Sequence, residues 1–424
     1  MLMPILAALA LVATAVATAV TTAVTTAVTT AAATPPEATD GSESRWEVAS
    51  RTDVFRSGEG GVDTYRIPSV VATKSGALLA FAEARHGNAS DTGDIDLVVR
   101  RSEDGGASWS DIAVVWDDGA NTCGNPCPVV DPATGAVVLL ATRNLGVDHE
   151  PRIIDGTSKG TRTVWVLRSA DDGRTWSAPE EITATAKRPD WTWYATGPGA
   201  GIALERGAHK GRLVVPCDHI EAGTKRYLSH VIWSDDHGKT WSLGGSSPSD
   251  QVNECEVLER ADGTLLLNMR NYDRTKRARQ ICESADGGAT WTAQRFDETL
   301  VEPICQASLR RIAWPSADGA PGLVAFSNPA SAGARERMTV RFSEDDGRTW
   351  PESIVVHGKG AAYSCLVALP RGEVGVLYEA DGYRRIEFAR IRRAGDQGSS
   401  GAPADGTGAS GETRATPPSG IRTE

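Results

Sequence analysis

The phrase Ser343-Glu-Asp-Asp-Gly-Arg-Thr-Trp350 decides the fold, because near-copies of it recur along the chain. All copies share the pattern Ser-x-Asp-x-Gly-x-Thr/Ser-Trp, in which the Asp can bond backbone amides, the Gly can take a positive φ and the Trp can anchor a turn. The residues before each copy are β-rich, so each phrase is predicted to close one strand and open the next. The other four copies are Ser102-Glu-Asp-Gly-Gly-Ala-Ser-Trp109, Ser169-Ala-Asp-Asp-Gly-Arg-Thr-Trp176, Ser234-Asp-Asp-His-Gly-Lys-Thr-Trp241 and Ser284-Ala-Asp-Gly-Gly-Ala-Thr-Trp291.

The spacing of the copies indicates the architecture. They begin 50 to 67 residues apart, which is long enough for several strands per unit and typical of a β-propeller. Residues 46–393 have room for roughly six such units, one of them without a recognisable phrase. The sequence therefore predicts an all-β, six-bladed propeller of four-stranded antiparallel blades, in which the phrases hold turns and carry no chemistry.

The two ends of the chain differ in composition from the middle. Residues 1–34 are uncharged and rich in Ala, Val and Thr, which favours a secretory signal peptide followed by a linker at 35–45. Without cleavage, the same apolar segment would instead anchor the protein in a membrane. Residues 394–424 form a low-complexity tail that is predicted to be disordered. We expect a secreted protein whose function lies in residues 46–393.

Composition excludes several classes of function. The histidines show no metal-ligand spacing, and the chain has no Gly-x-Ser-x-Gly elbow and no phosphate-binding glycine loop, so no metal and no cofactor are expected. The net charge of −11 argues against a nucleic-acid partner. The chain has seven cysteines, which are few for its length and odd in number, so it is not a disulfide scaffold. Cys123 and Cys127 are close enough in sequence to form a local disulfide, and they are equally suited to be free thiols in the core.

Three arginines occur in or beside predicted strands, namely Arg66, Arg270 and Arg335. Any one of them is explained by an ordinary surface ion pair. A propeller, however, brings the inner strands of every blade around one axis, so residues remote in sequence can meet at one mouth. The three arginines are therefore candidates for binding an anionic substrate.

At these residues the chain resembles the sialidase (neuraminidase) family, in its bacterial exo-sialidase branch. The resemblance covers residues 52–389 and adds several ordered segments to the repeated phrases. These are Tyr65-Arg-Ile-Pro68, Phe81-Ala-Glu-Ala-Arg85, Ser90-Asp-Thr-Gly-Asp-Ile-Asp96, Trp191-Thr-Trp-Tyr-Ala-Thr-Gly-Pro-Gly199, Val214-Val-Pro-Cys-Asp-His219, Asn253-Glu-Cys-Glu256, Ala362-Tyr-Ser364 and Leu377-Tyr-Glu379.

The resemblance implies that Arg66, Arg270 and Arg335 hold the carboxylate of a sialic acid. Planar guanidinium groups suit this role, because their forked donors match a carboxylate and stay charged at any working pH. Glu379 is implied to orient Arg66, and Arg85 is implied to reach the O4 side of the sugar or to support the triad.

Tyr363 is implied to be the nucleophile. The substrate carries a carboxylate on its anomeric carbon, so a neutral phenol meets less repulsion than an attacking Asp or Glu would. A phenol with an ordinary pKa of about 10 needs a base, and the resemblance assigns this role to Glu254. Glu256 is the alternative base, since it lies two residues further along the same strand face.

Asp91 is implied to be the general acid and base, on a loop whose composition allows movement. Asp94 is a weaker candidate for the general acid and base, because Asp94 and Asp96 are better explained as residues of a turn or a strand end. The aromatic side chains of Trp193 and Tyr194, close to Trp191, are expected either to line the pocket or to pack in the core. Residues 143–155, Asp218 and His219 are expected at most at the rim.

The function implied by the resemblance is that of a monomeric exo-α-sialidase, which releases terminal sialic acids from glycoproteins, glycolipids or oligosaccharides with retention through a tyrosyl intermediate. The alternatives are a trans-sialidase, a hydrolase for a deaminated sialic acid, and a propeller that binds sialoglycans without catalysis.

Overall fold

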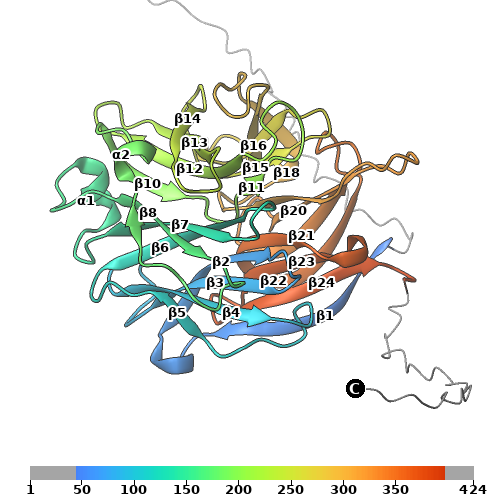
Figure 1. Ribbon diagram of the computed structural model, residues 1–424, viewed down its shortest axis with the longest axis horizontal. Helices are drawn as coiled ribbons and strands as arrows, with labels where there is room; N and C mark the ends of the chain where they lie inside the picture. Colours follow the sequence, from blue (N-terminus) through green and yellow to red (C-terminus); the bar gives the residue numbers. More distant parts are fainter. Residues whose placement is uncertain (1–43, 397–424) are drawn as a thin grey trace, which may run out of the picture. The chain divides into compact units, whose positions relative to one another are not determined.

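The structure is a computed structural model that describes residues 44–396. Strands dominate this part of the chain, and the helices in it are short (Figure 1). None of those helices is both long and apolar enough to cross a membrane. The expected signal peptide, most of the linker and nearly all of the tail lie outside the described residues. The all-β prediction is confirmed for residues 44–396.

The first sheet contains eight strands, which fall into two groups of four. Within each group the strands pair antiparallel, and the groups meet only through a parallel bridge between Ile95 and Thr122. The first group is β2 (Thr64–Ala72), β3 (Leu78–Arg85), β4 (Ile95–Ser102) and β5 (Ala113–Trp116). The second group is β6 (Thr122–Val130), β7 (Val137–Asn144), β8 (Thr163–Ser169) and β9 (Glu180–Glu181). The short helices α1 (Glu150–Asp155) and α2 (Thr183–Ala186) lie in the connections around β8 and β9.

Two further antiparallel sheets follow along the chain. The five-stranded sheet comprises β10 (Trp191–Thr196), β11 (Ile202–Ala203), β12 (Leu213–Glu221), β13 (Tyr227–Ser234) and β14 (Ser242–Ser246), with β10 and β11 both paired to β12. The four-stranded sheet comprises β15 (Val252–Glu259), β16 (Leu265–Asn271), β17 (Ala278–Ser284) and β18 (Arg295–Val301).

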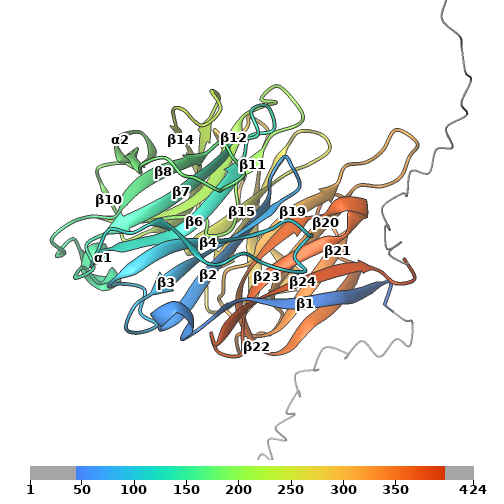
Figure 2. The same cartoon turned by 60° about the horizontal axis from the view of Figure 1, so that its bottom comes forward.

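The last sheet joins the two ends of the described chain. Its strand order is β1-β24-β23-β22-β21-β20-β19, so β1 lies beside β24 (Figure 2). Residues 352–360 of β22 pair with β21, whereas residues 361–368 pair with β23, so β22 serves two groups of four strands. The strands are β1 (Trp46–Arg56), β19 (Ser308–Ala313), β20 (Leu323–Pro329), β21 (Glu336–Ser343), β22 (Glu352–Ala368), β23 (Val374–Ala380) and β24 (Arg385–Arg393).

Every repeated phrase lies at the turn between the third and fourth strand of its group, as predicted. In the first copy, Ser102 Oγ donates to Asp104 Oδ1 at 2.8 Å and accepts from the Gly106 amide at 2.8 Å. Asp104 Oδ1 also accepts from the Ser108 amide at 2.9 Å. The Trp of the phrase packs on a neighbouring sheet, as Trp109 does edge-on against Phe388. The group formed by β22, β23, β24 and β1 lacks a phrase, because its outer strand comes from the start of the chain.

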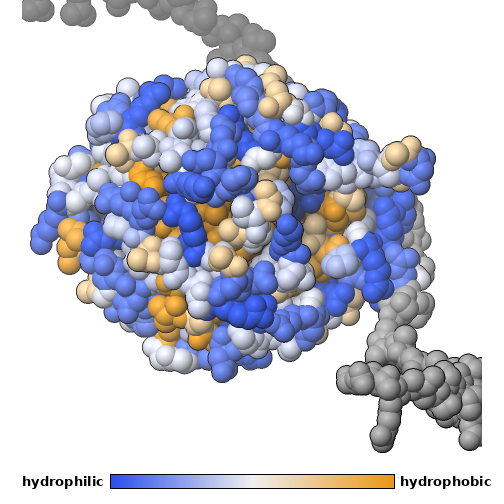
Figure 3. All heavy atoms as spheres, viewed as in Figure 1, coloured by the Kyte–Doolittle hydropathy of each residue, from blue (hydrophilic) through white to orange (hydrophobic). Residues whose placement is uncertain are grey.

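The core consists of the faces between neighbouring groups of four strands. Leu79, Phe81 and Leu139 belong to one such cluster and are completely buried. All seven cysteines are buried and free, so Cys123 and Cys127 form no disulfide. The surface shown in Figure 3 is mainly hydrophilic, with hydrophobic residues in small separate areas. This packing fixes the ends of the inner strands, which carry the site described next.

Candidate active site

A cavity of about 170 Å³ gathers the residues predicted for catalysis and for carboxylate binding. They come from four sheets, and their positions span almost 300 residues of the chain. Those lining the cavity are Arg66, Arg85, Asp91, Trp193, Glu254, Arg270, Arg335 and Tyr363. A larger and more apolar cavity of about 550 Å³ contains none of these residues, so the smaller one is the candidate active site.

Tyr363 and Glu254 are hydrogen-bonded in this cavity. The Tyr363 hydroxyl on β22 donates to Glu254 Oε1 on β15, and the Arg270 guanidinium donates to the same hydroxyl oxygen at 3.1 Å. Burial, with the negative charge of Glu254, raises the pKa of Tyr363 well above its ordinary value. The phenol is therefore neutral in the free protein, and any attack by its oxygen must be coupled to proton transfer to Glu254.

The three arginines approach the cavity from different elements. Arg66 belongs to β2, Arg270 to β16, and Arg335 directly precedes β21. Arg270 Nη1 lies 2.6 Å from Glu254 Oε2, while Arg335 Nη1 donates to the Tyr383 hydroxyl at 3.2 Å. Arg335 forms no ion pair with the rest of the described chain. The positive charge of Arg335 is therefore available to an anionic ligand.

Glu379 on β23 holds Arg66 and the strand of Tyr363 together. Its carboxylate accepts from Arg66 Nε at 2.9 Å and Nη2 at 3.2 Å. It also accepts from the backbone amides of Ile67 at 2.9 Å and Tyr363 at 3.0 Å. Burial alone would raise the pKa of Glu379, but the Arg66 ion pair and these hydrogen bonds lower it. A buried anion therefore fixes the position of Arg66 relative to Tyr363.

Asp91 lies on the loop between β3 and β4, at the edge of the cavity. Its side chain is 61% exposed, and Oδ1 lies 2.7 Å from Arg85 Nη1 and 3.5 Å from Arg66 Nη1. Partial burial would raise the pKa of Asp91, but the two arginines outweigh it and lower the pKa. The structure thus places Asp91 beside Arg66 and Arg85 in its ionised form.

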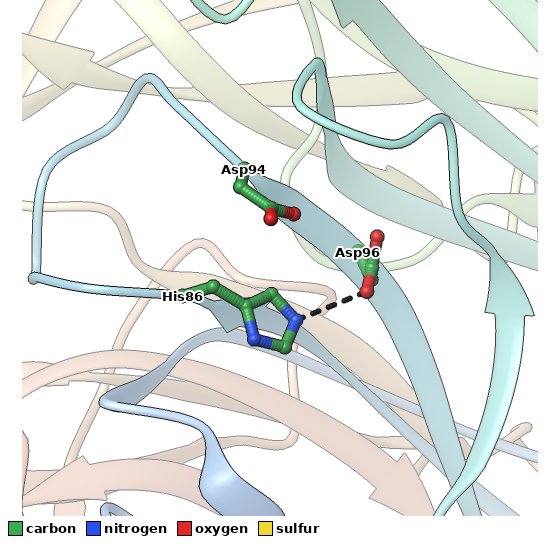
Figure 4. Close-up of side chains that lie close together, drawn as sticks. All are labelled: His86, Asp94 and Asp96. Atoms are coloured by element: carbon green, nitrogen blue, oxygen red, sulfur yellow. Dashed lines mark hydrogen bonds and ion pairs between the residues drawn. The ribbon is translucent and has the colours of Figure 1, made fainter.

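The alternatives to Asp91 lie away from the cavity. His86 and Asp96 hold the base of the same loop, with His86 Nε2 and Asp96 Oδ2 separated by 3.0 Å, and Asp94 lies beside them (Figure 4). The potential ligand atoms of these three side chains are within 4.8 Å of one another. Burial raises the pKa of Asp96 to about 6. Neither Asp94 nor Asp96 lines the cavity, so neither is positioned to protonate a ligand in it.

Glu256 and Tyr194 also lie outside the cavity. Glu256 is buried deeper, where its carboxylate binds the Leu309 amide at 3.0 Å and Ser308 Oγ at 3.1 Å. Tyr194 is completely buried in a core cluster, so of the two alternatives expected for it, packing in the core is the one that the structure shows. The reason is the alternation of a strand, which turns Trp193 and Ala195 of β10 towards the cavity and Tyr194 away from it.

Several polar residues line the cavity that sequence reasoning missed or placed only at the rim. Tyr272 follows Arg270 by two residues on an extended segment, so strand alternation could have identified it. Of the others, two lie outside the strands and four lie within strands, and which of these side chains face the cavity depends on packing. These residues are Glu83, Asn125, Glu150, Arg162, Asp218, Asn253 and Tyr272.

Comparisons with known proteins show which proteins the chain resembles. A family model described as a BNR repeat-like domain matches residues 76–376. A sialidase of Bacteroides fragilis is 32% identical over 359 residues, which cover 80% of this chain and 64% of that protein. A sialidase of Micromonospora viridifaciens is 33% identical, with coverage of 79% and 53%. An exo-alpha-sialidase of Aspergillus fumigatus is 33% identical, with coverage of 76% and 80%.

Solved structures that resemble this chain are also sialidases. A Hadza microbial sialidase, Hz136, superposes with a TM-score of 0.73 at 33% identity, covering 80% of this chain and 68% of that one. A sialidase of Trypanosoma rangeli has a TM-score of 0.66 at 20% identity, which shows similarity of fold alone, with coverage of 80% and 59%. The chain thus spans between about half and two thirds of the length of the first two curated relatives.

Proposed function

The chain belongs to the sialidase family, and from this premise we propose that it is an exo-α-sialidase that hydrolyses terminal sialic acids from glycoproteins, glycolipids or oligosaccharides. The observation that carries the proposal is the hydrogen bond between Tyr363 and Glu254 inside a cavity bordered by three arginines. A protein that only binds sialoglycans has use for the arginines but not for a phenol paired with a carboxylate.

We propose that the described strands form a closed six-bladed propeller. The sheets divide into six groups of four strands when β22 is shared between two groups and β10 and β11 are counted as one. The innermost strands contact one another in a ring, in the order β2, β6, β10 and β11, β15, β19, β22 and back to β2. Pairing of β1 with β24 supports closure, because it joins the first and last described strands in one blade.

The first chemical step would transfer the sialyl group to Tyr363. Arg66, Arg270 and Arg335 hold the carboxylate of the sugar, which places its anomeric carbon over the phenol oxygen. That oxygen bonds to the anomeric carbon while Glu254 accepts its proton. The bond from the anomeric carbon to the aglycone oxygen breaks, and Asp91 protonates the departing oxygen.

The second step would return the protein to its starting state. Asp91, now ionised, removes a proton from a water molecule, and the water oxygen bonds to the anomeric carbon. The bond to Tyr363 breaks, and Glu254 returns the proton to the phenol oxygen. Two inversions at one carbon leave the configuration unchanged, so the product is the α anomer.

Asp91 must carry a proton before the first step, although Arg85 and Arg66 lower its pKa in the free protein. A substrate carboxylate bound to Arg66 offsets the positive charge near Asp91. Binding therefore raises the pKa of Asp91, so that the general acid is protonated when the substrate is in place.

The experiment that tests the proposal is hydrolysis of a fluorogenic α-sialoside by the purified chain. The first sugar released should be the α anomer, seen by proton NMR before mutarotation. Absence of free sialic acid would refute the proposal, and transfer to added lactose in preference to water would indicate a trans-sialidase instead. We further propose that the protein is secreted, because residues 1–34 are uncharged and rich in Ala, Val and Thr. The proposed catalytic domain is residues 46–393, acting as a monomer.

A further inference from the structure

Asp218 is a buried acid that the proposed mechanism does not use. It belongs to β12, is 1% exposed and lines the cavity that holds Tyr363. Neither of its carboxyl oxygens has a hydrogen-bond partner in the described part of the chain. Buried polar groups almost always have partners, so an acid with two unpartnered oxygens beside a ligand cavity indicates a role in binding a ligand.

The protonation state of Asp218 follows from its surroundings. An ionised carboxylate without a partner is costly to bury, and the neutral acid avoids most of that cost. Burial, with the negative charge of Glu254, raises the pKa of Asp218 well above its ordinary value, although Arg162 opposes this change. A neutral carboxylic acid offers one donor and one acceptor, which is the combination that a sugar hydroxyl matches.

The position of Asp218 relative to the proposed substrate follows from the strands around it. In the proposed complex the three arginines hold the carboxylate on C2 of the sugar, and Arg85 reaches its O4 side. Asp218 pairs with Ser229 of β13, whose Oγ donates to the backbone carbonyl of Asn253, the residue before Glu254. Asp218 therefore lies on the side of the cavity formed by β12 and β15, whereas Arg85 belongs to β3 of another sheet. In the pyranose ring, C6 lies across the C2–C5 axis from C4, so C6 and its glycerol chain would face Asp218.

The same wall of the cavity carries further polar groups. Oδ1 of Asn253 is also buried without a partner, while Asn253 Nδ2 donates to the Tyr272 hydroxyl at 3.3 Å. The Arg162 guanidinium stacks 4.0 Å from the centre of the Trp193 ring, and its Nε donates to Asn144 Oδ1 at 3.1 Å. A wall with several unpartnered oxygens fits a substituent that carries several hydroxyls.

We propose that Asp218 recognises the outer hydroxyls of the substrate's glycerol side chain and so selects for an intact chain. This inference rests on the proposed function and adds a specificity-determining residue to it. Asp218 exchanges a hydrogen bond with a hydroxyl on C8 or C9 and takes no part in proton transfer at the anomeric carbon.

The test compares two fluorogenic α-sialosides, one intact and one shortened by periodate oxidation and borohydride reduction, which removes C8 and C9. Wild type should favour the intact substrate in kcat/KM on the order of 10-fold or more, because a site built to bind a hydroxyl rejects an analogue without it. In Asp218→Leu, which keeps the branched shape of the side chain but cannot hydrogen-bond, the ratio should fall to about 1. Asp218→Asn keeps a donor and an acceptor and should retain most of the preference.

Asp235→Asn is the matched control, because it alters an acid that pairs with Arg212 at 2.8 Å beside the ends of β12 and β13 and does not line the cavity. It should keep the wild-type ratio. An unchanged ratio in Asp218→Leu, or a ratio lost in Asp218→Asn, would overturn the inference. Calorimetric binding of intact and shortened free sialic acid to wild type and Asp218→Leu gives the same comparison without turnover, so failure of the proposed hydrolysis is distinguishable from failure of this inference.

Discussion

The hydroxyl of Tyr363 donates a hydrogen bond to the carboxylate of Glu254, although 109 positions separate the two residues in sequence. Arg270 donates to the same phenol oxygen and pairs with the same carboxylate. The carboxylate that would accept the phenol proton is thereby paired with a fixed cation. A neutral phenol, a carboxylate that can accept its proton and a fixed cation within one buried group are what proton-coupled attack by a tyrosine requires.

Tyr363→Phe removes the proposed nucleophile and should lower kcat on a fluorogenic α-sialoside on the order of 10³-fold or more. Tyr272→Phe is the matched control, because Tyr272 lines the same cavity, has its pKa raised to about 12 by burial, and forms no hydrogen bond with Glu254 in the described structure. It should retain kcat within about 10-fold. Similar losses in both variants would mean that Tyr363 only shapes the cavity.

Glu379→Ala should destabilise the fold by roughly 3–5 kcal/mol, because it leaves the Arg66 guanidinium buried without its partner. The pKa of Glu379 is lowered in the folded protein, so its contribution to stability is present above the ordinary carboxyl pKa of 4.5 and is lost as pH falls below it. Urea unfolding at several pH values measures this. A difference between wild type and Glu379→Ala that stays constant down to the acid limit would contradict the assignment.

The pH profiles of kcat and kcat/KM should differ for wild type. The second quantity reports the free protein, in which Arg85 and Arg66 lower the pKa of Asp91, so kcat/KM should rise as pH falls from 7 towards 4. In the complex the substrate carboxylate offsets Arg66, so the decline of kcat with increasing pH should begin at a higher pH. Steady-state kinetics from pH 4 to 8 measures how kcat and kcat/KM each decline with increasing pH. Declines at the same pH for both quantities would argue against Asp91 as the acid.

Asp91→Ala provides a second check on the same residue. Removing a general acid costs roughly 10²–10⁴-fold when the leaving group is a sugar alcohol, and much less when it is an acidic phenol that departs without protonation. The loss should therefore be larger on sialyllactose than on a fluorogenic aryl sialoside. An equal loss on both substrates would indicate a role in binding alone.

Asp286→Ala tests the repeated phrase as a structural element. Asp286 accepts from the Thr290 amide at 2.9 Å and from Thr290 Oγ1 at 2.6 Å, and these hydrogen bonds outweigh the effect of burial and lower its pKa to about 2. The variant should lose about 1–2 kcal/mol of unfolding free energy and keep kcat/KM. Thermal unfolding and fluorogenic kinetics measure the two effects, and a kinetic loss without a stability loss would contradict a purely structural role.

Some features of the site could be predicted from single positions. Arg66, Glu254 and Tyr363 lie in short segments that resemble the family, and strand alternation explains why Trp193 lines the cavity. The same alternation excludes Tyr194, but its phase cannot be determined from Trp191-Thr-Trp-Tyr because both faces of this segment carry aromatic residues. The sequence predicted Asp218 at most at the rim of the pocket. Its lack of a hydrogen-bond partner could not be predicted, because it depends on which side chains from other strands lie within reach.

The sequence by itself determined the all-β class, the positions of the turns and the set of chemical groups available, because propensity, turn chemistry and short motifs are local. Tertiary structure alone decided that Arg66, Glu254 and Tyr363 meet, that Glu379 fixes Arg66, and that Glu256 lies too deep to act as the base. These relationships depend on the packing of strands far apart in sequence. Burying a charged side chain costs free energy, and only a partner brought close by the fold offsets that cost.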